Sequence, residues 1–204
     1  MKLQFILPYI FFWILSHYNL KASILNCEIS CETEYQVIGK ICRCKIIGFD
    51  SASRETITEI AFNQQHFSGN LTDIKLLLID EQVMKFFPSN LYEFFPNLQG
   101  LIIDSSQLSS ISKNDLRNFP NLRMIFIGNN KIDELHDDLF EKNLSLEWIT
   151  FLNNFTKKIG SEILNSLSKL EFANFMRNSC VSYKAIGNAE IEKLKVFIKR
   201  DCTV

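Results

Sequence analysis

The residues of this chain with the greatest capacity for chemistry are its six cysteines, which form two groups. They are Cys27, Cys31, Cys42 and Cys44 near one end, and Cys180 and Cys202 near the other. The C-x3-C and C-x-C spacings of the first group are compatible with a zinc site, but an even number of cysteines in a secreted chain predicts disulfides instead. We therefore expect three disulfides and no bound metal.

Acid–base and nucleophilic catalysis has few candidates in the sequence. His66 and His136 are the histidines that follow the first 22 residues, and neither stands in an H-E-x-x-H motif. The sequence contains no G-x-S-x-G motif and no phosphate-cradling glycine loop. The acidic residues around His136 are expected to form a solvated loop. Because no nucleophile–base pair can be named, we expect a protein that is not an enzyme and needs no cofactor.

The first 22 residues predict the compartment. Lys2 precedes an apolar run from Leu3 to Leu15, and polar residues then lead to Ala22. The run is shorter than the roughly 20 residues that a membrane helix needs. This pattern is typical of a secretory signal peptide, here cleaved after Ala22. Since the C-terminus has no apolar tail for a lipid anchor, we expect a secreted, extracellular protein with no membrane segment after cleavage.

The elements that position the remaining residues follow a 24-residue period. Five units begin Ile74-Lys-Leu-Leu-Leu-Ile, Leu98-Gln-Gly-Leu-Ile-Ile, Leu122-Arg-Met-Ile-Phe-Ile, Leu146-Glu-Trp-Ile-Thr-Phe and Leu170-Glu-Phe-Ala-Asn-Phe. They match the pattern L-x-x-L-x-L, and the chain resembles the leucine-rich-repeat family over residues 57–180. The resemblance implies an α/β solenoid, an arc with about six short parallel strands on its concave face and irregular or helical convex segments. A degenerate first unit is expected to begin at Ile57.

We predict four segments from these patterns. They are a signal peptide (1–22), a cysteine-containing N-terminal cap (23–56), the repeats (57–180, with units starting at 57, 74, 98, 122, 146 and 170) and a C-terminal helical cap (181–204). The helix of the last segment is predicted because Ile191, Leu194 and Ile198 fall on one face. Cysteines that bracket repeats are similar to the caps of extracellular leucine-rich-repeat proteins, and the C-terminal segment is similar to that of small secreted insect members.

The positions of the cysteines limit how they pair. Alternate residues of a strand point to opposite faces, so Cys42 and Cys44 are not expected to bond to each other. The N-terminal cap then contains either Cys27 with Cys42 and Cys31 with Cys44, or the crossed arrangement. By elimination, the two C-terminal cysteines pair with each other.

Asparagines in the repeats have two different expected roles. The ninth slot of the unit holds Asn130, Asn154 and Asn178, and in this family that side chain turns inward to bond the backbone of the bend after the strand. We interpret these three as framework residues. Sequons occur at Asn70, Asn143 and Asn154, and the framework role of Asn154 opposes a glycan there. Asn70 and Asn143 remain as predicted glycosylation sites, with Asn70 the better candidate.

The concave face, which carries the third, fifth and seventh positions of each unit, is predicted to be apolar. Its expected ligand-binding residues are Leu76, Leu78, Ile102, Met124, Phe126, Trp148, Leu152, Phe172 and Met176, with Asp80 and Asp104 toward the N-terminal edge. A contiguous patch of Trp, Phe and Met suggests an interface with Trp148 as its anchor. The alternative is that a loop or the terminal helix covers these side chains.

These features predict a secreted recognition module that binds a protein, or a glycan- or lipid-bearing ligand, through its concave face. The alternative is a structural protein whose patch forms a homodimer or a matrix contact. Nucleic acid is not an expected partner, because the formal net charge is −1 and phosphate binding needs clustered Lys and Arg.

Overall fold

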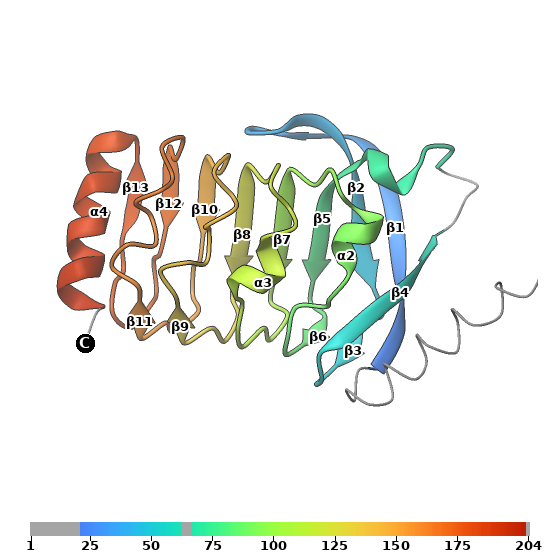
Figure 1. Ribbon diagram of the computed structural model, residues 1–204, viewed down its shortest axis with the longest axis horizontal. Coiled ribbons are helices and arrows are strands. Elements are labelled where there is room, and N and C mark those ends of the chain that lie inside the picture. The colour runs from blue at the N-terminus through green and yellow to red at the C-terminus, as the bar shows by residue number, and fades with distance from the viewer. Residues whose placement is uncertain (1–20, 63–66, 203–204) are drawn as a thin grey trace, which may run out of the picture.

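The computed structural model describes residues 21–62 and 67–202, and this part of the chain forms one nine-stranded sheet and two two-stranded sheets (Figure 1). The order in the large sheet is β13-β12-β10-β8-β7-β5-β2-β1-β4. Its strands are β1 (Lys21–Tyr35), β2 (Gly39–Ile47), β4 (Glu55–Phe62), β5 (Ile74–Asp80), β7 (Gly100–Asp104), β8 (Met124–Gly128), β10 (Trp148–Thr150), β12 (Phe172–Asn174) and β13 (Lys184–Ile186). Residues 1–20 of the predicted signal peptide lie outside the described residues, as does His66.

The repeat strands β5, β7, β8, β10 and β12 confirm the predicted solenoid. They run parallel and in register, so that Leu77, Leu101 and Ile125 lie side by side. The first, fourth and sixth positions of all five units are buried. Since each coil covers the apolar residues of the next, the units share one continuous core.

The convex side closes this core with short elements and aromatic rings. The short elements are η2 (Leu71–Asp73), α2 (Leu91–Phe94), α3 (Lys113–Leu116), and the paired strands β3 (Asp50–Ser51) with β6 (Val83–Met84) and β9 (Glu134–Leu135) with β11 (Lys158–Ile159). Phe87, Phe95 and Phe119 are buried beneath them, and the ring of Phe87 meets that of Phe119 edge-on at 6.5 Å. These rings therefore pack as core.

The N-terminal end of the sheet differs from the expectation that the Ile57 strand adjoins the strand from Ile74. Strand β2 is the parallel neighbour of β5, and β4, which contains Ile57, lies at the sheet edge beside β1. The interval from Ile57 to Ile74 is seven residues shorter than the repeat, which leaves little chain for a complete coil. The β1–β2 hairpin takes the position next to β5 instead. Ile57 still points into the core.

The C-terminal end is closed by a strand and a helix. Strand β13, which the sequence pattern did not predict, pairs antiparallel with β12, and α4 (Asn188–Asp201) packs over the end of the solenoid (Figure 1). Ile191, Leu194 and Ile198 are buried on one face of α4, as predicted. Among the described residues, no helix has the length and apolar character needed to cross a bilayer.

Three disulfides stabilise these caps, two within the β1–β2 hairpin and one at the end of α4. Cys27 bonds Cys44 and Cys31 bonds Cys42, which is the crossed arrangement of the two that the sequence left open. This pairing follows from the antiparallel register of β1 and β2. Cys27 lies opposite Ile46 and Cys44 lies opposite Ile29, so the two cysteines are diagonal neighbours across the hairpin. The expected bond between the two C-terminal cysteines joins the end of α4 to the segment after β12.

Candidate ligand-binding face

The register of the sheet arranges the concave side chains in rows that cross the strands. The first row consists of Leu76, Gly100, Met124, Trp148, Phe172 and Ile186. The next row consists of Leu78, Ile102, Phe126, Thr150, Asn174 and Lys184. Neighbouring strands lie about 4.8 Å apart, so side chains in one row contact each other. The chain thus brings residues that are 24 positions apart in sequence onto one surface.

The centre of this surface is an aromatic pair. The rings of Trp148 and Phe172 are stacked with centroids 4.9 Å apart and planes inclined by 26°, and both residues are half-buried. The ammonium group of Lys184 lies 5.3 Å from the centroid of the Phe172 ring. Stacking and a cation over the ring are both attractive and stabilise this arrangement of the aromatic side chains. The pair is therefore a packed, partly exposed apolar surface.

Exposed aliphatic residues extend the aromatic pair toward the C-terminal end. Met176 is 41% exposed and Ile186 is 64% exposed. Together with half-buried neighbours they form a surface that we call the open patch, made of Phe126, Trp148, Leu152, Phe172, Met176 and Ile186. Ile186 was not among the predicted site residues, because the repeat pattern ends before β13. The segment Lys184-Ala185-Ile186 places one small apolar residue inward between two outward residues, and three residues are too few to predict a strand.

The N-terminal half of the expected binding face is covered, so two of the predicted site residues are buried instead of exposed. Leu76 is 0% exposed and Met124 is 8% exposed, because Val37, Ile38 and Ile41 of the β1–β2 hairpin pack on them. Leu78 and Ile102 remain half-buried beside this contact. A covering loop was the alternative that the sequence left open, and the β1–β2 hairpin is that segment. The apolar Val37-Ile38 pair immediately before Gly39 is a hairpin signal that points to the covering segment.

The predicted acidic edge lies at the exit of the strands, where Asp104 belongs to a polar ladder. Asn129 Nδ2 donates to Asp104 Oδ1 at 2.8 Å, and Asn153 Nδ2 donates to Asn129 Oδ1 at 2.8 Å. Asp80 and Asp104 are both half-buried. The backbone takes the left-handed conformation at the matching position of each unit, with φ between 49° and 60° at Glu81, Ser105, Asn129, Asn153 and Arg177. This bend turns every strand toward the convex side in the same way.

The three framework asparagines act as structural ties between coils. Asn154 Nδ2 donates to the carbonyl of Ile127 at 2.8 Å, and Asn178 Nδ2 donates to that of Phe151 at 2.8 Å. Asn178 Oδ1 accepts from the backbone N–H of Asn154 at 3.2 Å. Asn130 makes the same type of contacts one coil earlier. Each side chain supplies bonds that the buried backbone of the bend cannot make within its own coil.

Burial separates the three sequons and corrects the prediction at Asn143. Asn143 is 0% exposed, and its Nδ2, the atom that would carry a glycan, donates to the carbonyls of Leu116 at 3.1 Å and Phe119 at 2.9 Å. A glycan on Asn143 is therefore incompatible with the folded coil. Asn154 is 1% exposed. Asn70 is exposed just before η2 and remains a predicted site.

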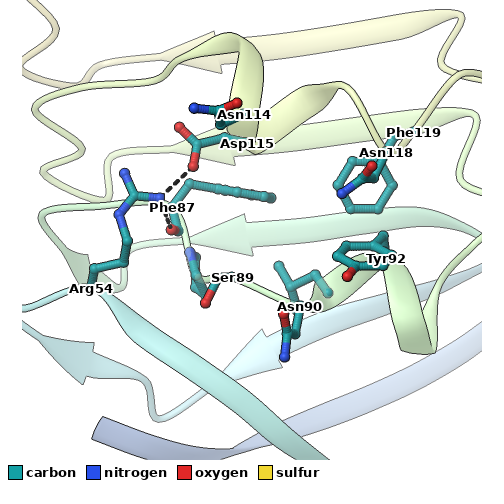
Figure 2. Close-up of a pocket in the computed structure, with 11 residues that line it drawn as sticks. Arg54, Phe87, Ser89, Asn90, Tyr92, Asn114, Asp115, Asn118 and Phe119 are labelled. Carbon is teal, nitrogen blue, oxygen red and sulfur yellow. Dashed lines mark hydrogen bonds and ion pairs between the residues drawn. The ribbon is translucent and has the colours of Figure 1, made fainter. Parts of the chain in front are cut away.

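A separate cavity of about 170 Å³ lies on the convex side between α2 and α3 (Figure 2). Its charged groups are Arg54 and Asp115, which form an ion pair, and the Arg54 guanidinium also donates to the Phe87 carbonyl at 3.3 Å. Asp115 accepts a bond from the backbone N–H of Ser112 at 2.9 Å, which caps α3. The Asp115 carboxylate is thus engaged by the helix cap and the ion pair, both of which are structural contacts.

The part of the chain that the structure describes contains no group of three His, Cys, Asp or Glu side chains close enough to hold a metal ion. His136 is exposed, and its Nδ1 lies 3.9 Å from Glu134 Oε1. The acidic residues around it are exposed to solvent, as the sequence pattern indicated.

Comparison with known proteins finds similar folds among solved structures. No protein-family model and no curated protein matches the chain. A chain of the Toll–Spatzle complex of Drosophila matches with 17% identity and a TM-score of 0.49, over 60% of this chain and 17% of that one. The leucine-rich-repeat ectodomain of the receptor kinase SOBIR1 from Arabidopsis thaliana matches with 19% identity and a TM-score of 0.44, over 76% and 79%. This chain thus spans about one sixth of the Toll-complex chain that it matches.

Proposed function

We propose that this protein is a secreted, non-enzymatic recognition module that binds a protein ligand through the open patch. The observation that supports the proposal most strongly is the stacked Trp148–Phe172 pair, half-buried on a sheet face with exposed Met176 and Ile186 beside it. Solvated surfaces seldom carry a contiguous group of aromatic and aliphatic side chains, whereas the centres of interfaces are enriched in them. Trp148 is the expected anchor, because tryptophan is common among residues that dominate binding energy.

The proposal can be tested with a photo-crosslinking amino acid at two positions. Benzoylphenylalanine replaces Phe126 in the open patch in one variant, and Tyr92 on the convex side, which is 37% exposed, in the other. Each purified protein is irradiated in extracellular fluid from the organism that makes it. We expect a discrete crosslinked product from position 126 and none from position 92. Equal products from both positions would contradict the proposal.

Competition identifies the surface that the ligand contacts. Excess wild-type protein is expected to remove the crosslinked product, whereas Trp148→Ala competes about 30-fold less well, the equivalent of about 2 kcal/mol. Ile186→Asp is a second variant at a side chain that is 64% exposed, and circular dichroism shows whether it stays folded. A product at twice the mass of the chain would support the alternative of self-association. Full competition by both variants would contradict a role for the open patch.

A further inference from the structure

The β1–β2 hairpin extends beyond the sheet as an arm, which we define as residues 32–41. Strand β2 pairs with β5 only from Cys42 onward, so the ladder bonds of the arm are those within the hairpin, such as Glu34 with Lys40. Figure 1 shows this end of the hairpin reaching from β2 along the sheet toward β8. Its turn, residues 36–38, precedes Gly39, whose φ is 72°. The arm is therefore held to the rest of the molecule mainly by its base and its tip.

The tip of the arm packs on the concave face in a cluster separate from the main core. Val37, Ile38 and Ile41 are each at most 9% exposed and contact Leu76 and Met124. Tyr35, Ile102 and Trp148 lie at the margin of this cluster. Because Leu76 and Ile102 lie on the face opposite the solenoid interior, lifting the arm would leave the main core intact. The same movement would join the covered residues to the open patch through Trp148.

Gly100 makes room for the tip. A Cβ atom at this position would lie 2.5 Å from Leu76 Cδ1, 3.0 Å from Ile38 Cδ1 and 3.3 Å from Met124 Cε. The row that contains Leu76 and Met124 thus has a gap in the middle, and the branched side chain of Ile38 fits into it. The gap over Gly100 therefore has room for a branched aliphatic side chain that a turn presents.

The base of the arm has the features of a hinge. The β1–β2 register shifts between Ser30 and Thr33, and the β2–β5 register shifts between Cys42 and Arg43. Such irregularities interrupt the ladder and bend the strand. The Cys31–Cys42 disulfide lies at the same level and keeps the two strands together there. The arm can therefore pivot as one unit without breaking a ladder bond to β5.

We propose that the arm occupies the docking site of a protein partner, which displaces it with a turn that carries two adjacent branched aliphatic residues. The arm itself shows which chemistry fits, since Val37 and Ile38 fill the place over Gly100. Displacement uncovers Leu76 and Met124 and extends the open patch across β5, β7 and β8. The inference rests on the proposed function, because it adds a regulated second half to the same binding face. The apparent affinity for this partner is the intrinsic affinity multiplied by the fraction of molecules with the arm lifted, so a mostly closed arm weakens binding.

The arm supplies its own probe. The synthetic peptide Cys-Glu-Thr-Glu-Tyr-Gln-Val-Ile-Gly-Lys-Ile-Cys, residues 31–42 closed by its disulfide, is titrated by calorimetry into two full chains. One is wild type, and the other is the double variant Val37→Ser with Ile38→Ser, whose arm cannot hold the site. We expect the double variant to bind the peptide at least about tenfold more tightly than wild type, since the tethered arm competes at an effective concentration of roughly millimolar.

Three controls distinguish specific docking of the peptide from nonspecific hydrophobic binding. A peptide with serine in place of both aliphatic residues should bind neither chain. Val196→Ser removes a valine that is 61% exposed on α4 and should bind the peptide as weakly as wild type does. Gly100→Ala keeps the arm sequence but crowds Ile38, so amide hydrogen exchange in residues 33–41 should become faster while β7 stays protected. This variant tests the contact independently if the double variant does not fold.

Two results would overturn the inference. The first is a folded double variant that does not bind the peptide, because the face would then not be a receptor for such a turn. The second is a wild-type dimer in light scattering that the double variant abolishes, because the arm would then dock on a second copy of the chain. Crosslinking from position 126 does not depend on the arm, so the proposed function can hold when this inference fails.

Discussion

Asn130 is the residue at which the framework of the solenoid can be tested most directly. Its Oδ1 accepts hydrogen bonds from the backbone N–H groups of Ser106 at 3.1 Å and Leu108 at 3.0 Å. Its Nδ2 donates to the carbonyls of Ile103 at 2.9 Å and Gly128 at 2.6 Å. The substitution Asn130→Ala removes these four bonds. Two backbone N–H groups and two backbone carbonyls, which belong to two adjacent coils, then lose Asn130 as a hydrogen-bond partner. Asn130 itself is 3% exposed, so water cannot easily replace it.

The expected loss of stability follows from this geometry. An unsatisfied buried polar group costs about 1–3 kcal/mol, and neighbouring groups that relax together lose less than the sum. We expect Asn130→Ala to lower the free energy of unfolding by about 4 kcal/mol. That is a large part of the roughly 5–15 kcal/mol that holds a domain of this kind together.

Guanidinium unfolding of the oxidised protein, followed by far-ultraviolet circular dichroism, measures this difference. The matched control is Lys131→Ala at the next position, where the side chain is exposed and bonds Gln107 Oε1 at 3.2 Å. The control should change the free energy of unfolding by less than about 0.5 kcal/mol. A loss below about 1 kcal/mol for Asn130→Ala would refute the reasoning, because the four bonds would then not tie the coils together.

Three further predictions concern the ends of the molecule and its modification. Mass spectrometry of protein secreted from eukaryotic cells should find a glycan at Asn70 and none at Asn143, whose amide is buried and bonded. Cys202→Ser opens the bond that closes α4 and should lower the free energy of unfolding by about 3 kcal/mol in denaturant titrations, as expected for a loop of this length. A hydrogen bond from Lys193, and a smaller contribution from the Tyr183 hydroxyl, hold the pKa of Glu190 below its ordinary value of 4.5. This contribution is complete above pH 4.5 and is lost as pH falls through the folded-state pKa, so the stability difference between wild type and Glu190→Gln should shrink in acid unfolding curves below pH 4.5.

The 24-residue period predicted the repeat strands and their buried positions because each coil is a local unit. Leu77, Leu101 and Ile125 point into the core because alternate strand residues face opposite sides of the sheet. Each coil has the same orientation, so the same position is buried in every unit. The role of Asn130 was predictable for the same reason, since every coil leaves the strand through a similar bend. Periodicity therefore carries most of the information about the solenoid.

The ends of the solenoid depend on contacts that have no period. The sequence could not decide that β2 rather than β4 would lie beside β5, because this choice depends on the antiparallel hairpin and its two disulfides. It could not identify β13 either, because a three-residue strand carries too weak a pattern. Asn143 falls in the slot that Phe95 and Phe119 occupy in neighbouring units, but only the packing of the convex coil placed its amide beside two carbonyls.

The candidate binding face shows the same division. Its strand positions and its Trp148 centre follow from the repeat, which sets which side chains face outward. The covering of Leu76 and Met124 follows from a contact between the arm and β5 to β8, segments far apart in the sequence. The sequence alone thus determined the solenoid, its framework and the outward residues, because these depend on neighbouring coils. Only the tertiary structure decided which outward residues are open, because that depends on where one hairpin from the cap folds back.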